Sequence, residues 1–242
     1  MEPHSQVDGW FGAQMPVDVL LSTMVNGGMQ GSLIEIGVFR GKSFIHMSRY
    51  LTAGQVYPSV AIDAFSMQES NLDGAGVGVK EIVLQNVRQH LPNELHELVK
   101  VVEASSLDST SHQVLNHTGN RPAIMFSVDA CHTFHCTLND LNLAKSALHP
   151  EGIIMLDDVF NPGWPGVMLG LGQFLADTRD TMTPFAFGLN KYFIANVGVA
   201  MRYINALKDA CEMSRIHKIA ASWNPSTFGN MINVETMIAK LN

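Results

Sequence analysis

The sequence predicts a doubly wound, mostly parallel α/β sheet, and three observations support this fold class. Short apolar runs recur along the chain, as expected for strands that are covered on both faces. Stretches with helical periodicity separate these runs. Breaker residues, such as the cluster His149-Pro150-Glu151-Gly152, stand where one element should give way to the next. Strands and helices that alternate in this way are typical of a parallel sheet with helices on both faces.

The expected elements follow in order along the chain. An apolar stretch, 17–25, predicts a leading helix before Gly27-Gly28. Five strands are expected next, at Ser32–Ile36, Val60–Asp63, Val99–Glu103, Ala123–Asp129 and Ile153–Asp157. Two of the helices between them place apolar residues on one face, in the stretches 79–91 and 134–148.

The last part of the chain departs from this alternation. Residues 185–195 look like two strands around a glycine-containing turn, which predicts an antiparallel hairpin and a total of seven strands. We therefore expect one domain over 1–242, with a helical extension at 1–30 and a core at 30–197. Residues 198–242 are expected to be helical at first and then irregular.

Composition limits the class of protein. The chain has 242 residues, 46% of them hydrophobic and 15% charged, which suits one soluble domain with a substantial core. No secretory signal or membrane span is expected, so a cytoplasmic location is predicted. The net charge of −7 argues against nonspecific binding to nucleic acid. The odd number of cysteines, Cys131, Cys136 and Cys211, predicts ordinary reduced thiols rather than disulfides or a zinc site.

The turn after the first expected strand is the most informative local feature. Gly37 and Gly41 stand four residues apart between this strand and a helix that begins near Ser43. Glycine has no Cβ, so such a turn lets the backbone lie against a small ligand. Glu35 precedes the first glycine, and Asp63 ends the next strand, where an acid can bind ribose hydroxyls. These parts suit a nucleoside-type cofactor.

Every expected central strand ends near a carboxylate. The carboxyl ends of the strands form the ligand-binding edge of an open α/β sheet. Like charges gathered there repel one another, so a ligand or cation that offsets them is expected. The alternative is a set of solvated loop acids. The polar residues at these ends are Glu35, Asp63, Glu103, Ser105, Ser106, Asp129, Asp157 and Asp158.

Three common motifs are absent from the sequence. The turn lacks the G-x-G-x-x-G fingerprint of NAD enzymes, and the bulky Phe39 would crowd a diphosphate. Gly41-Lys42-Ser43 lacks the spacing of a phosphate-binding loop. No G-x-S-x-G elbow of a hydrolase is present.

In their order along the chain, these residues resemble a known enzyme family. The resemblance rests on E-I-G-V-F-R-G, Ile62-Asp63, Val102 to Ser106, Val128-Asp129-Ala130-Cys131-His132 and Leu156-Asp157-Asp158. Together they resemble class I S-adenosylmethionine-dependent methyltransferases, in the small O-methyltransferase-like branch, over roughly residues 30–197. The resemblance implies a Rossmann-like methyltransferase fold and methyl transfer to a hydroxyl of a small molecule or natural product.

The resemblance also implies roles for the cofactor residues. The loop from Gly37 to Gly41 would bind the methionine part of S-adenosylmethionine, whose carboxylate would meet the backbone near Ser43. Asp63 would accept hydrogen bonds from the ribose. Ser105 or Ser106 would lie at the adenine, with Glu103 just inside. Glu35 and Asp129 would give the positive amino and sulfonium groups an acidic surrounding.

His132 is the candidate base, with Asp129 beside it, because a hydroxyl acceptor must lose a proton. The alternatives are a surface or helix-capping role for His132 and, as a weaker base, His135. Phe160 and Trp164, in the loop after the acid pair, are candidates for the acceptor pocket, although Trp164 could simply pack that loop. Lys191 either approaches the pocket or lies on an exposed turn.

A metal and two competing functions stay open at this point. Asp129, Asp157 and Asp158 could coordinate Mg²⁺, which prefers oxygen ligands. Relatives of the catechol type carry Asp-Asn where this chain has Asp-Asp, and other relatives use no metal. The alternatives are an NAD-type oxidoreductase and a non-catalytic relative. The expected partner is a small-molecule acceptor, and the apolar leading helix offers a surface for a homodimer.

Overall fold

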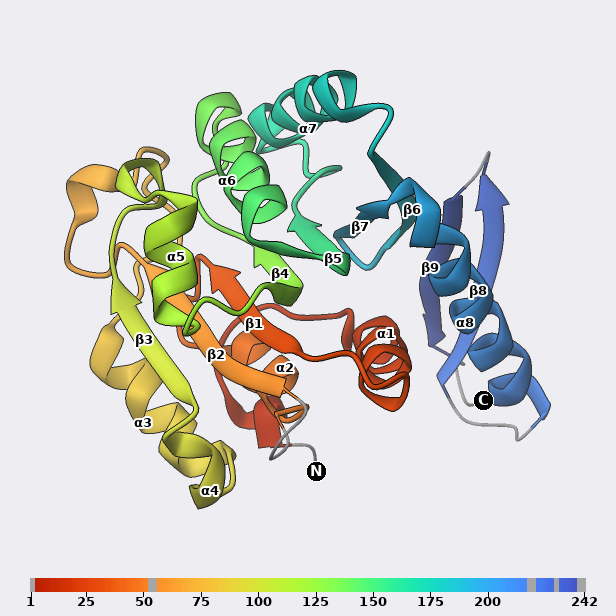
Figure 1. Cartoon of the computed structure of the whole chain (residues 1–242), viewed down its shortest axis with the longest axis horizontal. Helices are drawn as coiled ribbons and strands as arrows, with labels where there is room; N and C mark the ends of the chain where they lie inside the picture. Colours follow the sequence, from red (N-terminus) through yellow and green to blue (C-terminus); the bar gives the residue numbers. More distant parts are fainter. Residues whose placement is uncertain (1–2, 52–55, 217–220, 229–230, 239–242) are drawn as a thin grey trace.

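One mixed sheet organises the whole molecule, with helices on both of its faces (Figure 1). The computed structural model describes residues 3–51, 56–216, 221–228 and 231–238. Nine strands lie in the order β3-β2-β1-β4-β5-β7-β6-β9-β8. The first five strands are parallel, and β7 then pairs antiparallel with both β5 and β6. The carboxyl ends of the five parallel strands therefore meet at one edge.

The five expected strands and the leading helix are all present, with some starts displaced by a few residues. The strands are β1 Gly31–Ile36, β2 Val56–Asp63, β3 Val99–Glu103, β4 Ala123–Val128, β5 Leu148–Asp157, β6 Met182–Gly188, β7 Lys191–Asn196, β8 Ala221–Phe228 and β9 Met231–Ile238. The helices are α1 Gln14–Asn26, α2 Lys42–Ser48, α3 Lys80–His90, α4 Asn93–His96, α5 Ser111–His117, α6 Phe134–Ala147, α7 Pro165–Thr178 and α8 Val197–Ile216. Short 3₁₀ turns lie at Pro3–Gln6, Gln68–Ser70 and Ser106–Asp108.

The two faces of the sheet carry separate helix layers and cores. On one face α5, α6 and α7 pack together, and Phe126 of β4, Leu141 and Phe174 belong to one buried core there. On the other face α1 packs against α8, and α2 lies between α1 and α3 (Figure 1). Both faces of β1 and β4 are fully buried, which explains why these strands are continuous apolar runs.

The predicted fold class is confirmed, but the described part of the chain forms nine strands in the sheet instead of seven. The tail after α8 was expected to be irregular, and it instead forms the hairpin β8–β9, with β9 parallel to β6. Polar residues and a proline interrupt these two strands, so neither shows the apolar run by which the earlier strands are recognised. The strand β5 also begins earlier than expected, at Leu148, and includes the cluster of breaker residues.

The leading helix α1 is confirmed, but its apolar face is occupied. Val17, Leu20, Leu21 and Met24 are fully or almost fully buried in the core shared with α8. The homodimer expected through this face stays a prediction, without support from these side chains. Among the described residues, no helix is long and apolar enough to cross a membrane.

Candidate active site

A cavity of about 940 Å³ opens at the carboxyl ends of β1, β2, β4 and β5. Residues of the N-terminal segment, from Asp8 to Gly12, form one of its walls. The predicted site residues that line it are Gly37, Ser43, Asp63, Ser105, Ser106, Asp129, His132, Asp157, Asp158 and Trp164. Strands far apart in the sequence thus bring most of the predicted set together at one edge, as the fold class requires.

The glycine turn lies directly against the end of β4. The Gly37 backbone has φ +78°, and a Cβ built there would stand 2.0 Å from the carbonyl oxygen of Asp129. Only glycine fits this close approach of two backbones. Gly41, with φ +89°, ends the turn as the N-cap of α2 but is not part of the cavity lining.

Asp63 fixes the conformation of this turn. One carboxylate oxygen accepts hydrogen bonds from the backbone N–H groups of Val38 and Phe39, at 2.7 and 3.0 Å. The other accepts from the N–H of Phe65 at 2.9 Å. Each carboxylate oxygen can accept two hydrogen bonds, so Asp63 can still receive a ligand hydroxyl in the cavity.

Glu35 lies beneath the cavity wall and is fully buried. Its Oε1 accepts hydrogen bonds from the hydroxyls of Ser43 and Ser127, at 2.7 and 2.9 Å, while Oε2 has no partner in the structure. Burial raises the pKa of Glu35 to about 7, against the opposing effect of these hydroxyls. Its carboxylate thus joins the start of α2 to β4 through these two serines.

The end of β3 contributes serines to the cavity but not its acid. Ser105 and Ser106 line the cavity, and Asn139 of α6 donates to the Ser106 carbonyl at 3.0 Å. Glu103 lies outside the lining and instead accepts hydrogen bonds from the backbone N–H and the hydroxyl of Ser66. These bonds lower the pKa of Glu103.

Lys191 joins two of the predicted acids. Its Nζ lies 3.1 Å from Asp129 and also donates to Asp157. The Lys191 side chain is 2% exposed, although a place on an exposed turn was the alternative. Burial lowers the pKa of Lys191, but the two carboxylates outweigh it and raise that pKa. Burial and the charge of Asp129 raise the pKa of Asp157.

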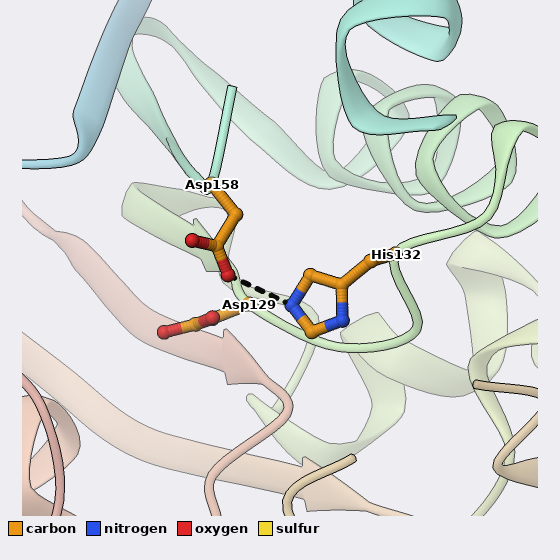
Figure 2. Close-up of side chains that lie close together, drawn as sticks. All are labelled: Asp129, His132 and Asp158. Atoms are coloured by element: carbon orange, nitrogen blue, oxygen red, sulfur yellow. Dashed lines mark ion pairs between the residues drawn. The ribbon is translucent and has the colours of Figure 1, made fainter. Parts of the chain in front are cut away.

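His132 stands between two carboxylates at the end of β4. Its Nδ1 lies 2.6 Å from Asp73. Its Nε2 lies 3.0 Å from Asp158, and this ion pair is marked in Figure 2. The indole of Trp164 stacks on the imidazole at 4.6 Å between centroids. Burial lowers the pKa of His132, but the hydrogen bonds to Asp158 and Asp73 raise it to about 9. The imidazole is therefore protonated at neutral pH in the absence of an acceptor.

The side chains of His132, Asn161 and Asn190 fix the carboxylate of Asp158. Its Oδ1 accepts from the side-chain amides of Asn161 and Asn190, at 2.9 and 2.6 Å. These bonds and His132 outweigh burial and lower the pKa of Asp158. Its φ of +60° is unusual for a residue with a side chain, and such strain is concentrated at functional sites.

The expectation of three reduced cysteines is wrong for two of them. Cys131 and Cys136 form a disulfide, with a Cα–Cα distance of 5.6 Å, and both line the cavity. The tight turn into α6, capped by Thr133 on the N–H of Cys136, brings the two sulfurs together over a separation of five residues. Neither spacing nor the odd count could show this turn. Cys211 is buried in α8.

The family of the chain follows from a match to a known domain. Residues 34–159, from β1 to the end of the acid pair, match the family model described as a methyltransferase domain. The chain belongs to this methyltransferase family. The match covers the glycine turn, the strand-end acids and His132. S-adenosylmethionine is accordingly the methyl donor of this methyltransferase.

Solved methyltransferases share the fold. The O-methyltransferase NovP is 14% identical, with a TM-score of 0.59 over 76% of this chain and 80% of its own. An O-methyltransferase from Bacillus cereus in complex with S-adenosylhomocysteine is 19% identical, with a TM-score of 0.53 over 78% and 83%. MycE from the mycinamycin pathway, in complex with Mg and S-adenosylhomocysteine, is 16% identical, with a TM-score of 0.51 over 77% and 51%. No curated protein matches the chain.

The three predicted magnesium ligands of this methyltransferase do not converge on one point. Asp129 and Asp157 are paired with Lys191, while Asp158 is turned to His132. In the part of the chain that the structure describes, a different trio has its potential ligand atoms within 4.8 Å of one another, namely Asp129, His132 and Asp158 (Figure 2). The ring nitrogens of His132 already face carboxylates there.

Phe160 lies outside the cavity of the methyltransferase. It is 59% exposed, and its ring contacts Phe187 and Tyr192 at 5.9 Å between centroids. The predicted role of the neighbouring loop in acceptor binding therefore rests on Trp164.

Asp73 was not recognised from the sequence, and Lys191 was considered near the pocket without its pairing to the two acids. Asp73 belongs to the loop between β2 and α3, 59 residues before His132, and no pattern links the two. Lys191 did carry a signal, because it begins a strand that pairs antiparallel with β5. In that register Lys191 lies opposite Asp157.

Proposed function

We propose that this methyltransferase transfers the methyl group of S-adenosylmethionine to a hydroxyl of a small molecule or natural product, with His132 as general base. The observation that carries the proposal is the Asp73–His132 pair at the cavity wall, 2.6 Å apart. An acid that fixes one ring nitrogen leaves the other to take a proton. The O-methyltransferase neighbours support a hydroxyl acceptor.

The residues present fit the cofactor. The cavity of about 940 Å³ has room for a cofactor and an acceptor, and Gly37 presents no side chain where its backbone meets the end of β4. We place the methionine part at the turn from Gly37 to Gly41 and near Ser43. The ribose is placed at Asp63, and the adenine at Ser105 and Ser106. Asp129, partly exposed at the wall, suits the positive amino group.

Glu35 and Glu103 are assigned indirect roles in cofactor binding. Glu35 accepts a hydrogen bond from Ser43 and so fixes the start of α2 under the cofactor turn. Glu103 fixes Ser66 beside the end of β2. Both residues therefore shape the cofactor site from outside the cavity.

The protein contributes orientation, proton transfer and exclusion of water. When bound, S-adenosylmethionine would supply an activated methyl group for the acceptor oxygen. His132 Nε2 takes the hydroxyl proton, and Asp73 stabilises the imidazolium that forms. Entry of the acceptor hydroxyl between His132 and Asp158 replaces their 3.0 Å contact. Trp164 covers the imidazole and limits access of water to it.

The rate of methyl transfer should rise with pH because the base must be unprotonated. We expect kcat/KM to increase through an apparent pKa of about 9, the value for His132, and then to level off. The Asp158→Asn variant removes one carboxylate that raises this pKa, so its profile should move to lower pH. A profile that is flat between pH 6.5 and 9 in the wild type would count against His132.

Calorimetric titration of S-adenosylhomocysteine into the full chain tests the cofactor assignment. We expect binding of micromolar strength, about −8 kcal/mol. Asp63→Asn should weaken it, because Asp63 both braces the turn and faces the cavity. The matched control is Asp108→Asn, an exposed acid that follows Ser106 and lies outside the lining. Absence of binding by the folded wild type would overturn the assignment and direct attention to nicotinamide cofactors.

The proposed partner is a small acceptor rather than a macromolecule. The cavity is bounded by the N-terminal segment, the loop with Asp73 and the loop with Trp164, which suits an enclosed ligand. The net charge of −7 disfavours nucleic acid. A cytoplasmic location stays a proposal, and the Cys131–Cys136 disulfide does not support it.

A further inference from the structure

Lys191 is a buried lysine among the carboxylates at the ends of the parallel strands. It does not line the cavity, and its ammonium lies beneath the wall. The antiparallel register of β5 and β7 sets Lys191 opposite Asp157. The ring of Phe11, 5.9 Å from Nζ, contacts the same ammonium from the N-terminal segment. The lysine is therefore built into the fold and enclosed.

Its position coincides with that expected for a metal ion. The sequence places Asp129 and Asp157 at the ends of neighbouring strands, where two carboxylates repel each other unless a cation lies between them. The Lys191 ammonium is that cation, 3.1 Å from Asp129 and hydrogen-bonded to Asp157. Its positive charge also favours the ionised form of the buried Glu35 and so opposes the rise in the pKa of that carboxyl.

We propose that Lys191 replaces a divalent cation at this site, so that the methyltransferase holds Asp129 and Asp157 with its own ammonium and binds no metal there. Mg²⁺ needs several oxygen ligands at close range and a strong negative charge around it. Lys191 neutralises part of that charge and engages one oxygen of each of the two carboxylates. The third predicted ligand, Asp158, is turned to His132, Asn161 and Asn190.

The trio of Asp129, His132 and Asp158 does not provide a substitute metal site. A histidine ligand must offer a ring nitrogen with a free lone pair. Both ring nitrogens of His132 lie within 3.0 Å of a carboxylate oxygen, one from Asp73 and the other from Asp158. Asp129 remains paired with Lys191. The contacts that orient His132 as the proposed base therefore occupy the ring nitrogens that a metal ion would need.

Lys191 is then a positioning residue. It fixes the Asp129 carboxylate at the cavity wall, where the amino group of the cofactor is placed. This role in the reaction rests on the methyl transfer proposed above, whereas the exclusion of a metal does not. The two can therefore be tested separately.

Titration with Mn²⁺, followed by its electron paramagnetic resonance signal, tests the exclusion without any turnover. At neutral pH, we expect the full-length wild type to show no saturable, stoichiometric Mn²⁺ site. Lys191→Met frees Asp129 and Asp157, and should bind Mn²⁺ at least about tenfold more tightly, because affinity follows the charge of the ligand set. Asp129→Asn added to Lys191→Met should abolish the gain.

Each result decides the question. A stoichiometric Mn²⁺ site in the wild type that Asp129→Asn removes would overturn the proposal, as would a folded Lys191→Met variant with no gain. If Lys191→Met does not fold, Lys191→Gln, which keeps a polar group in place of the ammonium, takes its place in the same titration. Failure of S-adenosylhomocysteine to bind would instead contradict the proposed function and leave the Mn²⁺ result valid.

Discussion

Lys191→Met should destabilise the protein more than any other single change at the site. The substitution leaves Asp129 and Asp157 beside each other without a cation, and the Asp157 side chain is only 10% exposed. Breaking a buried ion pair by removing one partner costs about 3–5 kcal/mol. We expect a loss of this size in the free energy of unfolding, measured by urea denaturation at neutral pH.

Two further variants separate the charge effect from the loss of a lysine. Lys145→Met, on the exposed side of α6, should change the free energy of unfolding by no more than about 0.5 kcal/mol. Adding Asp129→Asn and Asp157→Asn to Lys191→Met removes the uncompensated charges and should restore part of the loss. If the single variant is as stable as the wild type, Lys191 does not compensate these carboxylates.

His132→Gln should have the largest effect on the reaction. It removes the group proposed to take the acceptor proton, while the amide keeps a polar side chain beneath Trp164. General base catalysis contributes about 100- to 10,000-fold, so kcat should fall by that factor. S-adenosylhomocysteine should bind with nearly unchanged affinity, because His132 is placed on the acceptor side of the cavity.

His135→Gln is the matched control for this experiment. His135 lies three residues further on, at the start of α6, where its ring meets the edge of Phe134 and is exposed. Its replacement should leave kcat within about twofold, an effect below roughly 0.5 kcal/mol. Equal losses in the two variants would contradict a specific role for His132. A loss of cofactor binding in His132→Gln would point to a structural role instead.

Much of the fold was predictable because local sequence dictates it. The strands β1 and β4 are buried on both faces, and this burial produces the continuous apolar runs from which they were predicted. The hairpin β8–β9 was missed for the converse reason. Its strand β9 pairs with β6, and this pairing depends on tertiary context rather than on a local pattern.

The site was predictable only in part, for a related reason. The acids at the strand ends follow from the topology of the sheet, so Asp63, Asp129 and Asp158 could be placed at one cavity in advance. Asp73 could not, since it comes from an irregular loop whose path across the sheet edge no periodicity encodes. The pairing of Lys191 depends on the register between β5 and β7. A slip of one residue would turn the Lys191 side chain to the other face of the sheet.

The backbone around His132 is constrained before any acceptor binds. The Cys131–Cys136 bridge, the Thr133 cap and the bond from the His132 N–H to Asp73 all constrain the same few residues. Fixing the backbone of one residue costs about 1–2 kcal/mol in conformational entropy. That loss is complete once the chain has folded, so the imidazole meets its acceptor already ordered.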